Sequence, residues 1–343
     1  MASNNSSDVY PYVKSFSAVF IQDFPTSNTS NQRLFLYFFP VIFVFGIVGN
    51  TLSFCVMYTA RMRRCSYSYY LSTLAVFDSG MLVFNALAWV NAIAFMAANK
   101  IVVTIDSDIR CKVMELYSDV FMMGSSWTVV IVTLERLVIV LFPFKGRIVC
   151  TPKFARGVVA AHVLVVFAMS PWTASSTHYV PGEGCYRTKS DLVADYTFSS
   201  FLYIYIPIIL TFGANFIIIA VMCRSSKFGD SSNKSNTARR VTCTILTISI
   251  TFLCLVLPLG IIAVMFGSAK TQQMRDKLAT IMDTCRIVLS LNYCTNFYLY
   301  LITGKEIRKA LVGLCRRGND SSGSATKAVA TVSSADTSQT SRF

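Results

Sequence analysis

The chain has 343 residues, of which 54% are apolar and only 14% are charged, and its mean hydropathy is +0.53. Because soluble domains usually carry about 25% charged residues, this composition excludes an ordinary soluble protein and indicates one that spans a membrane. The net charge of +14 does not indicate nucleic-acid binding, because the basic residues gather at the ends of the apolar segments, as they do in membrane proteins.

Seven apolar segments follow one another, each long enough to cross a bilayer as a helix. They cover about residues 34–59, 68–97, 111–141, 154–176, 197–223, 240–266 and 279–303. The seventh is the weakest, because charged and amide residues interrupt it. We therefore predict an all-α membrane protein built as a seven-transmembrane helix bundle.

The distribution of basic residues predicts the orientation of these spans. The segments after the first, third, fifth and seventh spans are rich in Lys and Arg, whereas the opposite loops mix both signs. Basic loops remain in the cytoplasm, so we expect an extracellular N-terminus and a cytoplasmic C-terminus in the plasma membrane. Asn4, Asn5 and Asn28 each begin an Asn-x-Ser/Thr sequence, so they are candidate glycosylation sites. The alternative is an unmodified polar tail.

The third span carries an adjacent acid and arginine, Glu135 and Arg136, 25 residues after Cys111. Charges in such a segment are costly unless they have a function. Since 25 residues of helix rise about 37 Å, Cys111 and Arg136 are expected at opposite membrane faces. With the prolines of spans five and six and the end of span seven (Asn296 to Tyr300), this pattern resembles the rhodopsin-like G-protein-coupled receptors over about residues 34–315.

The resemblance implies which residues couple the receptor to a G protein. Glu135 would hold Arg136 at rest, and the released arginine would reach the G protein. The remaining residues of the implied switch are Phe252, Pro258, Asn296 and Tyr300. A snorkelling arginine at the end of a span is the alternative for Arg136.

Five positions depart from the family pattern. Leu137 follows the arginine in place of the usual aromatic residue, Phe297 replaces a proline, and Val256 replaces a tryptophan. Asn215 stands where a tyrosine is expected and His162 is near the position of a tryptophan. The last three changes remove the family's aromatic trigger and leave two alternatives: the ligand reaches Phe252 by another route, or the coupling is unusual.

Eleven cysteines do not form a disulfide scaffold here, because most lie in spans or on the reducing side. Cys111 and Cys185 are the two expected at the extracellular face. A bridge between them would fasten the loop between spans four and five to the top of span three.

Polar residues are expected midway along four spans, and they include the carboxylate of Asp78. A lone acid in lipid needs polar partners, a proton or a cation. The set Asp78, Ser125, Asn292 and Asn296 resembles the family's sodium site. A hydrogen-bond network without an ion is the alternative. We expect no cofactor apart from this sodium ion as an allosteric modulator.

The ligand is predicted from the charges near the extracellular side. A cleft of mixed sign is expected from Glu115, Asp119, Asp195, Asp283 and Arg286. It suits a peptide with charged and amidated ends, and the residues 63–71 with Asn296-Phe297 look like invertebrate neuropeptide receptors, including FMRFamide-like types. A receptor for a small amine or lipid is the alternative. Ser290 lies where an opsin would need a lysine to bind retinal, so a light sensor is not expected.

The expected organisation is an extracellular tail at 1–33, the bundle at 34–303, a short amphipathic eighth helix at 304–315 and a disordered tail at 316–343. Cys315 is a candidate for palmitoylation. Phosphorylated Ser and Thr of the tail would bind arrestin, and Ser341 with Phe343 would suit a PDZ domain.

A non-receptor transporter is a second class of function, but the chain shows no internal repeat. An enzyme is not expected, because a metal-dependent enzyme would need clustered His, Asp or Glu on the span faces, and the two histidines, His162 and His178, are expected far apart.

Overall fold

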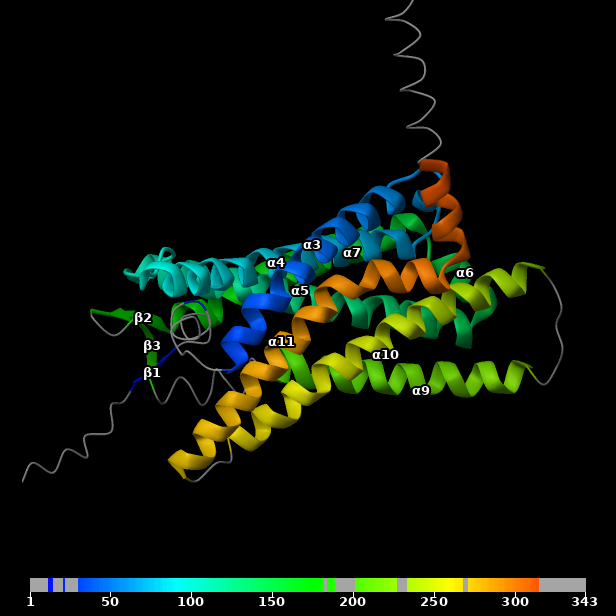
Figure 1. Ribbon diagram of the computed structural model, residues 1–343. Coiled ribbons are helices and arrows are strands. Elements are labelled where there is room, and N and C mark those ends of the chain that lie inside the picture. The colour runs from blue at the N-terminus through cyan, green and yellow to red at the C-terminus, as the bar shows by residue number, and fades with distance from the viewer. Residues whose placement is uncertain are drawn as a thin grey trace, which may run out of the picture.

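The computed structural model describes residues 12–14, 21, 30–181, 184–188, 201–226, 233–267 and 271–314. Seven long helices lie roughly side by side in one bundle (Figure 1). They are α3 (Ser30–Met57), α4 (Tyr67–Ala98), α5 (Asp108–Leu141), α7 (Pro152–Ser175), α9 (Ile206–Ser226), α10 (Asn233–Gly267) and α11 (Gln272–Thr303). The predicted seven-helix bundle is confirmed. Helix α3 begins four residues before the expected first span and α11 seven residues before the seventh.

Six of these helices are long and apolar enough to cross a membrane by length and composition, and α11 is the exception. It packs against α3, α4 and α10. Its polar residues Ser290, Asn292 and Asn296 are buried within the bundle. The low hydropathy of α11 therefore reflects inward-facing polar residues, while its position in the bundle is set by its neighbours.

Large apolar side chains cover much of the outside of the bundle. Tyr37 on α3, Leu164 on α7 and Phe216 on α9 are among the most exposed. In water such a surface would be unfavourable, but against lipid chains it costs nothing. The exposed apolar surface fits a multi-pass membrane protein.

Local sequence signals set several helix ends. The hydroxyls of Ser107, Thr151 and Thr271 accept hydrogen bonds from backbone N–H groups three residues later, which starts α5, α7 and α11. Asn99 ends α4 in the left-handed conformation, with φ of 51°. Pro258 lies inside α10, whereas α11 continues through Phe297 to Thr303 as one helix.

A small antiparallel sheet lies at one end of the bundle, which we call the sheet end (Figure 1). Strands β2 (Thr177–Val180) and β3 (Gly184–Thr188) form a hairpin, and β1 (Tyr12–Lys14) pairs with the other edge of β3. These three strands were not anticipated in an all-α fold. A segment from the expected N-terminal tail thus adds a strand to the loop between spans four and five.

The predicted eighth helix occupies residues 305–314 and turns away from α11 at the end opposite the sheet (Figure 1, dark orange). Ile307 and Ala310 are buried against the bundle, while Lys305, Arg308 and Lys309 are exposed. A Cβ at Gly304 would lie 2.7 Å from the carbonyl oxygen of Tyr300, so this corner requires glycine. The helix is therefore amphipathic, as expected.

Candidate functional site

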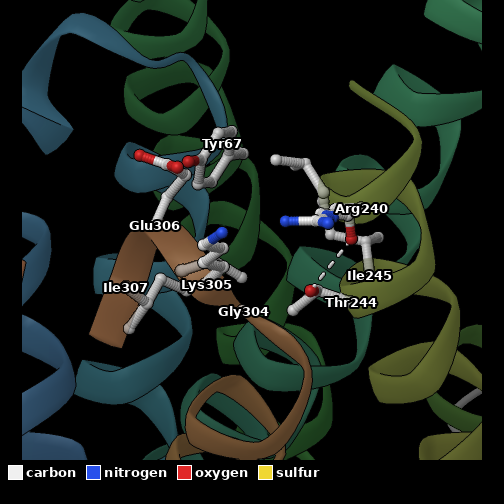
Figure 2. Close-up of a pocket in the computed structure, with 10 residues that line it drawn as sticks. Tyr67, Arg240, Thr244, Ile245, Gly304, Lys305, Glu306 and Ile307 are labelled. Atoms are coloured by element: carbon white, nitrogen blue, oxygen red, sulfur yellow. Dashed lines mark hydrogen bonds between the residues drawn. The ribbon is translucent and has the colours of Figure 1, made fainter. Parts of the chain in front are cut away.

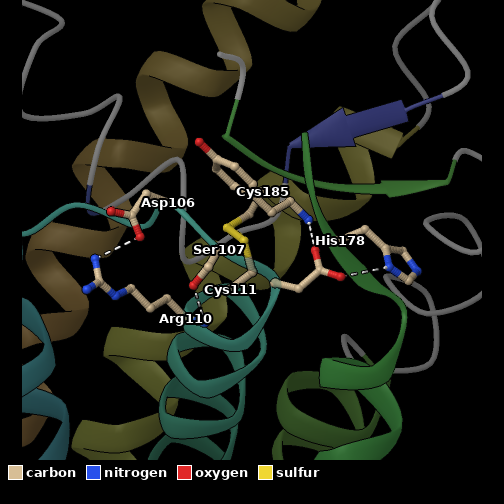
Figure 3. Close-up of a disulfide and its surroundings, with 8 residues drawn as sticks. Asp106, Ser107, Arg110, Cys111, His178 and Cys185 are labelled. Carbon is tan, nitrogen blue, oxygen red and sulfur yellow. Dashed lines mark hydrogen bonds and ion pairs between the residues drawn. A yellow bond between two sulfur atoms is a disulfide. The ribbon is translucent and has the colours of Figure 1, made fainter. Parts of the chain in front are cut away.

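The predicted bridge between Cys111 and Cys185 is present at the sheet end, with a Cα–Cα distance of 5.7 Å (Figure 3). Cys111 lies in the first turn of α5 and Cys185 in β3. Next to the bridge, the Asp108 carboxylate accepts from the backbone N–H of Tyr179 and lies 4.0 Å from Nδ1 of His178. The hairpin is therefore attached to α5 by a covalent bond and by polar contacts.

Two acidic residues of the expected ligand cleft lie on α5, about one and two turns after Cys111. Glu115 and Asp119 are both buried. Ser118 between them is buried too, and its hydroxyl donates to the backbone carbonyl of Glu115 at 3.0 Å. The two carboxylates are thus inside the bundle rather than on a solvated loop.

The other charges of the cleft lie on α11. Arg286 donates to the Asp283 carboxylate at 2.7 Å, and both side chains are largely shielded. Ser290, one turn further, accepts a hydrogen bond from Asn85 of α4 at 3.0 Å. Asp195 lies outside the described residues. The predicted cleft residues therefore form two groups, one on α5 and one on α11.

The carboxylate of Asp78 is fully buried at the middle of α4, and two predicted partners hold it. Ser125 donates to Oδ1 at 2.6 Å, and the amide of Asn296 donates to Oδ2 at 2.7 Å. Asn292 takes part through its backbone carbonyl, which accepts from Asn296 at 3.2 Å. The structure brings these four residues from α4, α5 and α11 together.

Asn50 and Ser53 of α3 are also buried, and Asn50 donates to the carbonyl of Tyr293 at 3.0 Å. Within the described part of the chain, Oδ1 of Asn50 and Oγ of Ser53 have no hydrogen-bond partner. Unpaired buried oxygens are rare because they lose their hydration. Oxygen ligands are those that a hard cation prefers, and among these residues the Asp78 carboxylate and the Ser125 hydroxyl lie in contact.

At the opposite end of α5, Glu135 and Arg136 are buried and form an ion pair. The hydroxyl of Ser66 donates to the same carboxylate oxygen at 2.7 Å, and the guanidinium carbon of Arg136 lies 5.3 Å from the centre of the Tyr67 ring. The Arg136 side chain is thus held against α4.

Cys150 follows the short helix α6 (Pro143–Val149) at the same end of the bundle. Burial raises the pKa of its thiol, and the nearby Glu135 carboxylate raises this pKa further.

The role of Ser66 was not predicted from the sequence. It precedes α4 directly, a position where serine usually caps the helix, yet its side chain makes no cap hydrogen bond. It bonds across to α5 instead. Only the packing of the segment after α3 against α5 reveals this role.

A small cavity lies between α4, α10 and the helix 305–314 (Figure 2), and it adjoins this ion pair through Tyr67, which contacts Arg136. Tyr67, Arg240, Thr244, Lys305 and Glu306 are among the residues that line it. The cavity therefore combines apolar walls with both signs of charge at the end of the bundle opposite the sheet.

The expected switch residues lie between these two ends. Phe252 is buried in a cluster with Leu74, Val129 and Val256, so Val256 packs beside Phe252 where a tryptophan was expected. Tyr300 is buried in a separate cluster with Tyr70 and Ile248. Pro258 lies within α10 two turns from Phe252.

Two of the other departures, Asn215 and His162, make polar contacts between helices. Oδ1 of Asn215 on α9 accepts from Ser249 of α10 at 2.9 Å. His162 of α7 lies 3.2 Å from both the Thr128 hydroxyl and the Gly124 carbonyl of α5. The sequence alone did not indicate these hydrogen bonds, and the His162 ring also packs against the ring of Phe77, with the ring centres 5.7 Å apart.

Several predicted sites lie outside the described residues. They are the glycosylation candidates Asn4, Asn5 and Asn28, the palmitoylation candidate Cys315, and the tail residues Ser341 and Phe343.

Comparison with known proteins adds a family match. Residues 49–300 match the model of the 7 transmembrane receptor (rhodopsin family). The chain is 24% identical to the FMRFamide peptide receptor frpr-18 of Caenorhabditis elegans, over 84% of this chain and 70% of that protein. It is 23% identical to the RYamide receptor of Drosophila melanogaster, over 83% and 63%, and 24% identical to a purinoceptor of Mus musculus, over 82% and 78%.

Proposed function

Because the chain belongs to the rhodopsin family of seven-transmembrane receptors, we propose that it binds an extracellular peptide and activates a heterotrimeric G protein. Membership of a receptor family also agrees with the prediction that the chain is not an enzyme. In the proposed orientation the sheet end is extracellular, and the helix 305–314 lies at the cytoplasmic face of the plasma membrane.

The ligand class rests on the names of two relatives and on the buried acids of α5. Both names refer to an amidated peptide and include an arginine next to an aromatic residue, in one-letter code. Glu115 and Asp119 place two carboxylates inside the bundle below the disulfide. Buried carboxylates attract a guanidinium strongly, because the local dielectric constant is low. We therefore favour a short amidated peptide that contains arginine.

The test is a calcium and cyclic-AMP screen of cells that express the receptor, against amidated peptides and their free-acid forms, amines and nucleotides. Glu115→Gln and Asp119→Asn should each weaken the response to an active arginine peptide by about tenfold or more, since one charge-assisted contact is lost. Asp106→Asn, an exposed acid paired with Arg110 at the same end, is the control and should change it less than twofold. A response only to amines or only to nucleotides would exclude the peptide proposal.

The proposed coupling site is the cavity near Arg136. In the resting form the ion pair with Glu135 and the contact with Tyr67 hold the arginine against α4. A change at Phe252 and Pro258 would move α10, which forms one wall of the cavity. The freed Arg136 and the enlarged cavity would then accept a segment of the G protein.

Sodium is proposed as an allosteric ion at Asp78, Ser125, Asn292 and Asn296. The buried carboxylate of Asp78 and its contacts with Ser125 and Asn296 support this assignment. When bound, the cation would neutralise the buried carboxylate. Asp78 would supply the charge, and Ser125 would supply a neutral oxygen.

The remaining proposals concern the modified ends of the chain. Glycosylation at Asn4, Asn5 or Asn28, palmitoylation at Cys315, and arrestin binding to the phosphorylated tail follow from sequence patterns alone. The same holds for a PDZ domain that would bind the final residues, with Phe343 in its pocket. A peptide of the last ten residues should lose binding to PDZ domains when its carboxyl group is amidated.

A further inference from the structure

Two phenylalanine rings join α4 and α5 by packing on glycines of the opposite helix. A Cβ added at Gly80 of α4 would overlap the ring of Phe121 of α5. In the same way, a Cβ added at Gly124 of α5 would overlap the ring of Phe77 of α4. The two rings also meet edge to face, with their centres 6.1 Å apart. We call these two contacts the ring–glycine interlock. Because each ring lies directly on the backbone of the other helix, α5 cannot slide along α4 without moving both rings.

One contact of the interlock adjoins the buried acid of α4. Phe77 directly precedes Asp78. Its partner Gly124 directly precedes Ser125, whose hydroxyl donates to Asp78 at 2.6 Å. Since adjacent residues share one backbone, a shift of α5 against the Phe77 ring also moves the Ser125 hydroxyl relative to the carboxylate. The position of this ring therefore affects the geometry of the hydrogen bond.

A third helix fixes the same contact. The ring of Phe77 meets the ring of His162 of α7 edge to face, with the centres 5.7 Å apart. Nε2 of His162 also lies 3.2 Å from the carbonyl oxygen of Gly124. A carbonyl oxygen only accepts, so Nε2 donates this hydrogen bond. One histidine thus contacts both partners, the ring of Phe77 and the backbone of Gly124.

The other contact of the interlock leads toward the proposed ligand residues. Tyr117 lies one turn before Phe121 on α5, and their ring centres are 4.5 Å apart. The Tyr117 hydroxyl donates to the carbonyl oxygen of Gly80 at 3.1 Å. Asp119 lies between the two aromatic residues in the sequence. A ligand that contacts Asp119 therefore acts on the turn of α5 that carries both rings.

The interlock is also connected to Phe252. Leu74 lies one turn before Asp78 on α4, on the side away from the sheet end. It is buried in one cluster with Val129 of α5 and Phe252 of α10. Val256 belongs to the same cluster and stands where the family has a tryptophan. A change in the packing of α4 against α5 can thus reach Phe252 without that tryptophan.

We propose that Phe77 and Phe121 are positioning residues that transmit a ligand's contact with α5 to Phe252. They take the role of the tryptophan that α10 lacks. This inference rests on the proposed function, because it requires a ligand at the acids of α5. Packed interiors change between discrete arrangements rather than deform continuously, so both rings move together when the ligand shifts α5. The hydrogen bond of Asp78 and the packing around Phe252 change in the same step.

The first test needs no ligand and measures basal G-protein activation per receptor at the cell surface, as binding of a non-hydrolysable GTP analogue. Gly80→Ala places a methyl group where the Phe121 ring lies, so it should displace the ring and raise basal activation several-fold. Adding Phe121→Ala to the same chain removes the overlap and should restore the natural level to within about twofold. A merely structural clash would lower surface expression without raising activation per receptor.

Gly213→Ala is the matched control, since a Cβ at this position of α9 meets nothing within 4 Å, and it should leave basal activation unchanged. Natural basal activation in Gly80→Ala at the surface overturns the proposal. A raised activation that Phe121→Ala does not reverse overturns it as well.

The second test uses Phe121→Leu, a milder change that serves even if Gly80→Ala fails to reach the surface. The probe is the amidated peptide Phe-Met-Arg-Phe-amide. Loss of the ring should lower the maximal response by roughly threefold or more, while the Kd of the labelled peptide changes less than about twofold. Phe216→Leu removes a lipid-exposed ring of α9 and should leave both quantities unchanged.

The two proposals fail in different ways. An undiminished maximal response in Phe121→Leu overturns the role of the interlock and leaves the peptide proposal standing. A natural protein that responds to no peptide contradicts the proposed function, and the basal measurement then decides the interlock by itself.

Discussion

Ser66 and Arg136 both contact the carboxylate of Glu135, and their contacts have different consequences. The ion pair fixes the arginine, whereas the 2.7 Å hydrogen bond from Ser66 fixes the acid. Oε2 of Glu135 and Nε of Arg136 have no partner within the described residues. The resting arrangement therefore depends on few contacts, and the loss of one should shift it.

The first prediction is that Ser66→Ala raises signalling without ligand. A hydrogen bond to a charged group contributes roughly 1.5–3 kcal/mol, and about 1.4 kcal/mol changes an equilibrium tenfold. Basal G-protein activation should rise several-fold at equal surface expression. Ser72→Ala is the control, because the Ser72 hydroxyl bonds only to the carbonyls of Ser68 and Tyr69 in its own helix among the described contacts. Equal basal activity in both variants would contradict the role of Ser66.

The second prediction concerns the buried acid of α4. Asp78→Asn removes the charge and keeps the shape, so an ion held by the carboxylate should no longer bind. Sodium should lower agonist affinity in the natural protein and have no effect in the variant, measured by ligand displacement with and without sodium chloride. Ser79→Ala, which removes a hydroxyl bonded to Ala75 of the same helix, should leave the sodium effect intact. A sodium effect that persists in Asp78→Asn would place the ion elsewhere.

At the scale of elements, the disulfide decides where the hairpin lies. It joins β3 to α5 across 74 residues of sequence, and closing a loop of that length removes about 4 kcal/mol of unfolded-chain entropy. The third prediction is that Cys111→Ser or Cys185→Ser strongly reduces surface expression or ligand response. Cys254→Ser, a free exposed cysteine of α10, is the control. Peptide mapping without reduction that found both cysteines as free thiols would refute the bridge.

Helix α11 was predicted from the sequence as the seventh span, although its mean hydropathy is low. Its amides and serine are costly in lipid, but they face Asp78 and Asn85 inside the bundle. The helix is continuous through Phe297, where the related motif has proline. The absence of that proline keeps the backbone hydrogen-bond donor that proline lacks.

At the scale of the whole molecule, α5 connects the two ends. Glu115 and Asp119, the proposed ligand residues, lie near its start, and Arg136 lies near its end. The fourth prediction is therefore that Arg136→Ala abolishes G-protein activation while ligand binding at the cell surface remains measurable. Arg156→Ala, an exposed arginine over the Tyr69 ring, is the control and should signal normally. Normal signalling by Arg136→Ala would exclude this residue from coupling.

The sequence by itself determined the number of spans and the two cysteines of the disulfide, and its resemblance to the receptor family pointed to the polar core around Asp78. The physical reason is that lipid imposes strong local rules. A span must be long and apolar, and buried polar groups must have a purpose. Spacing along a helix then places Cys111 and Arg136 at opposite ends without any tertiary information.

The tertiary structure decided the contacts between segments that no local pattern couples. It brought Ser66 to Glu135, Asn215 to Ser249, and Arg61 to the helix 305–314. It also added β1 to the hairpin and separated the cleft charges into groups on α5 and α11. These outcomes depend on how helices rotate and pack against one another, which is set by the summed fit of many side chains. Local propensity carries no information about that fit, so the sequence could not predict them.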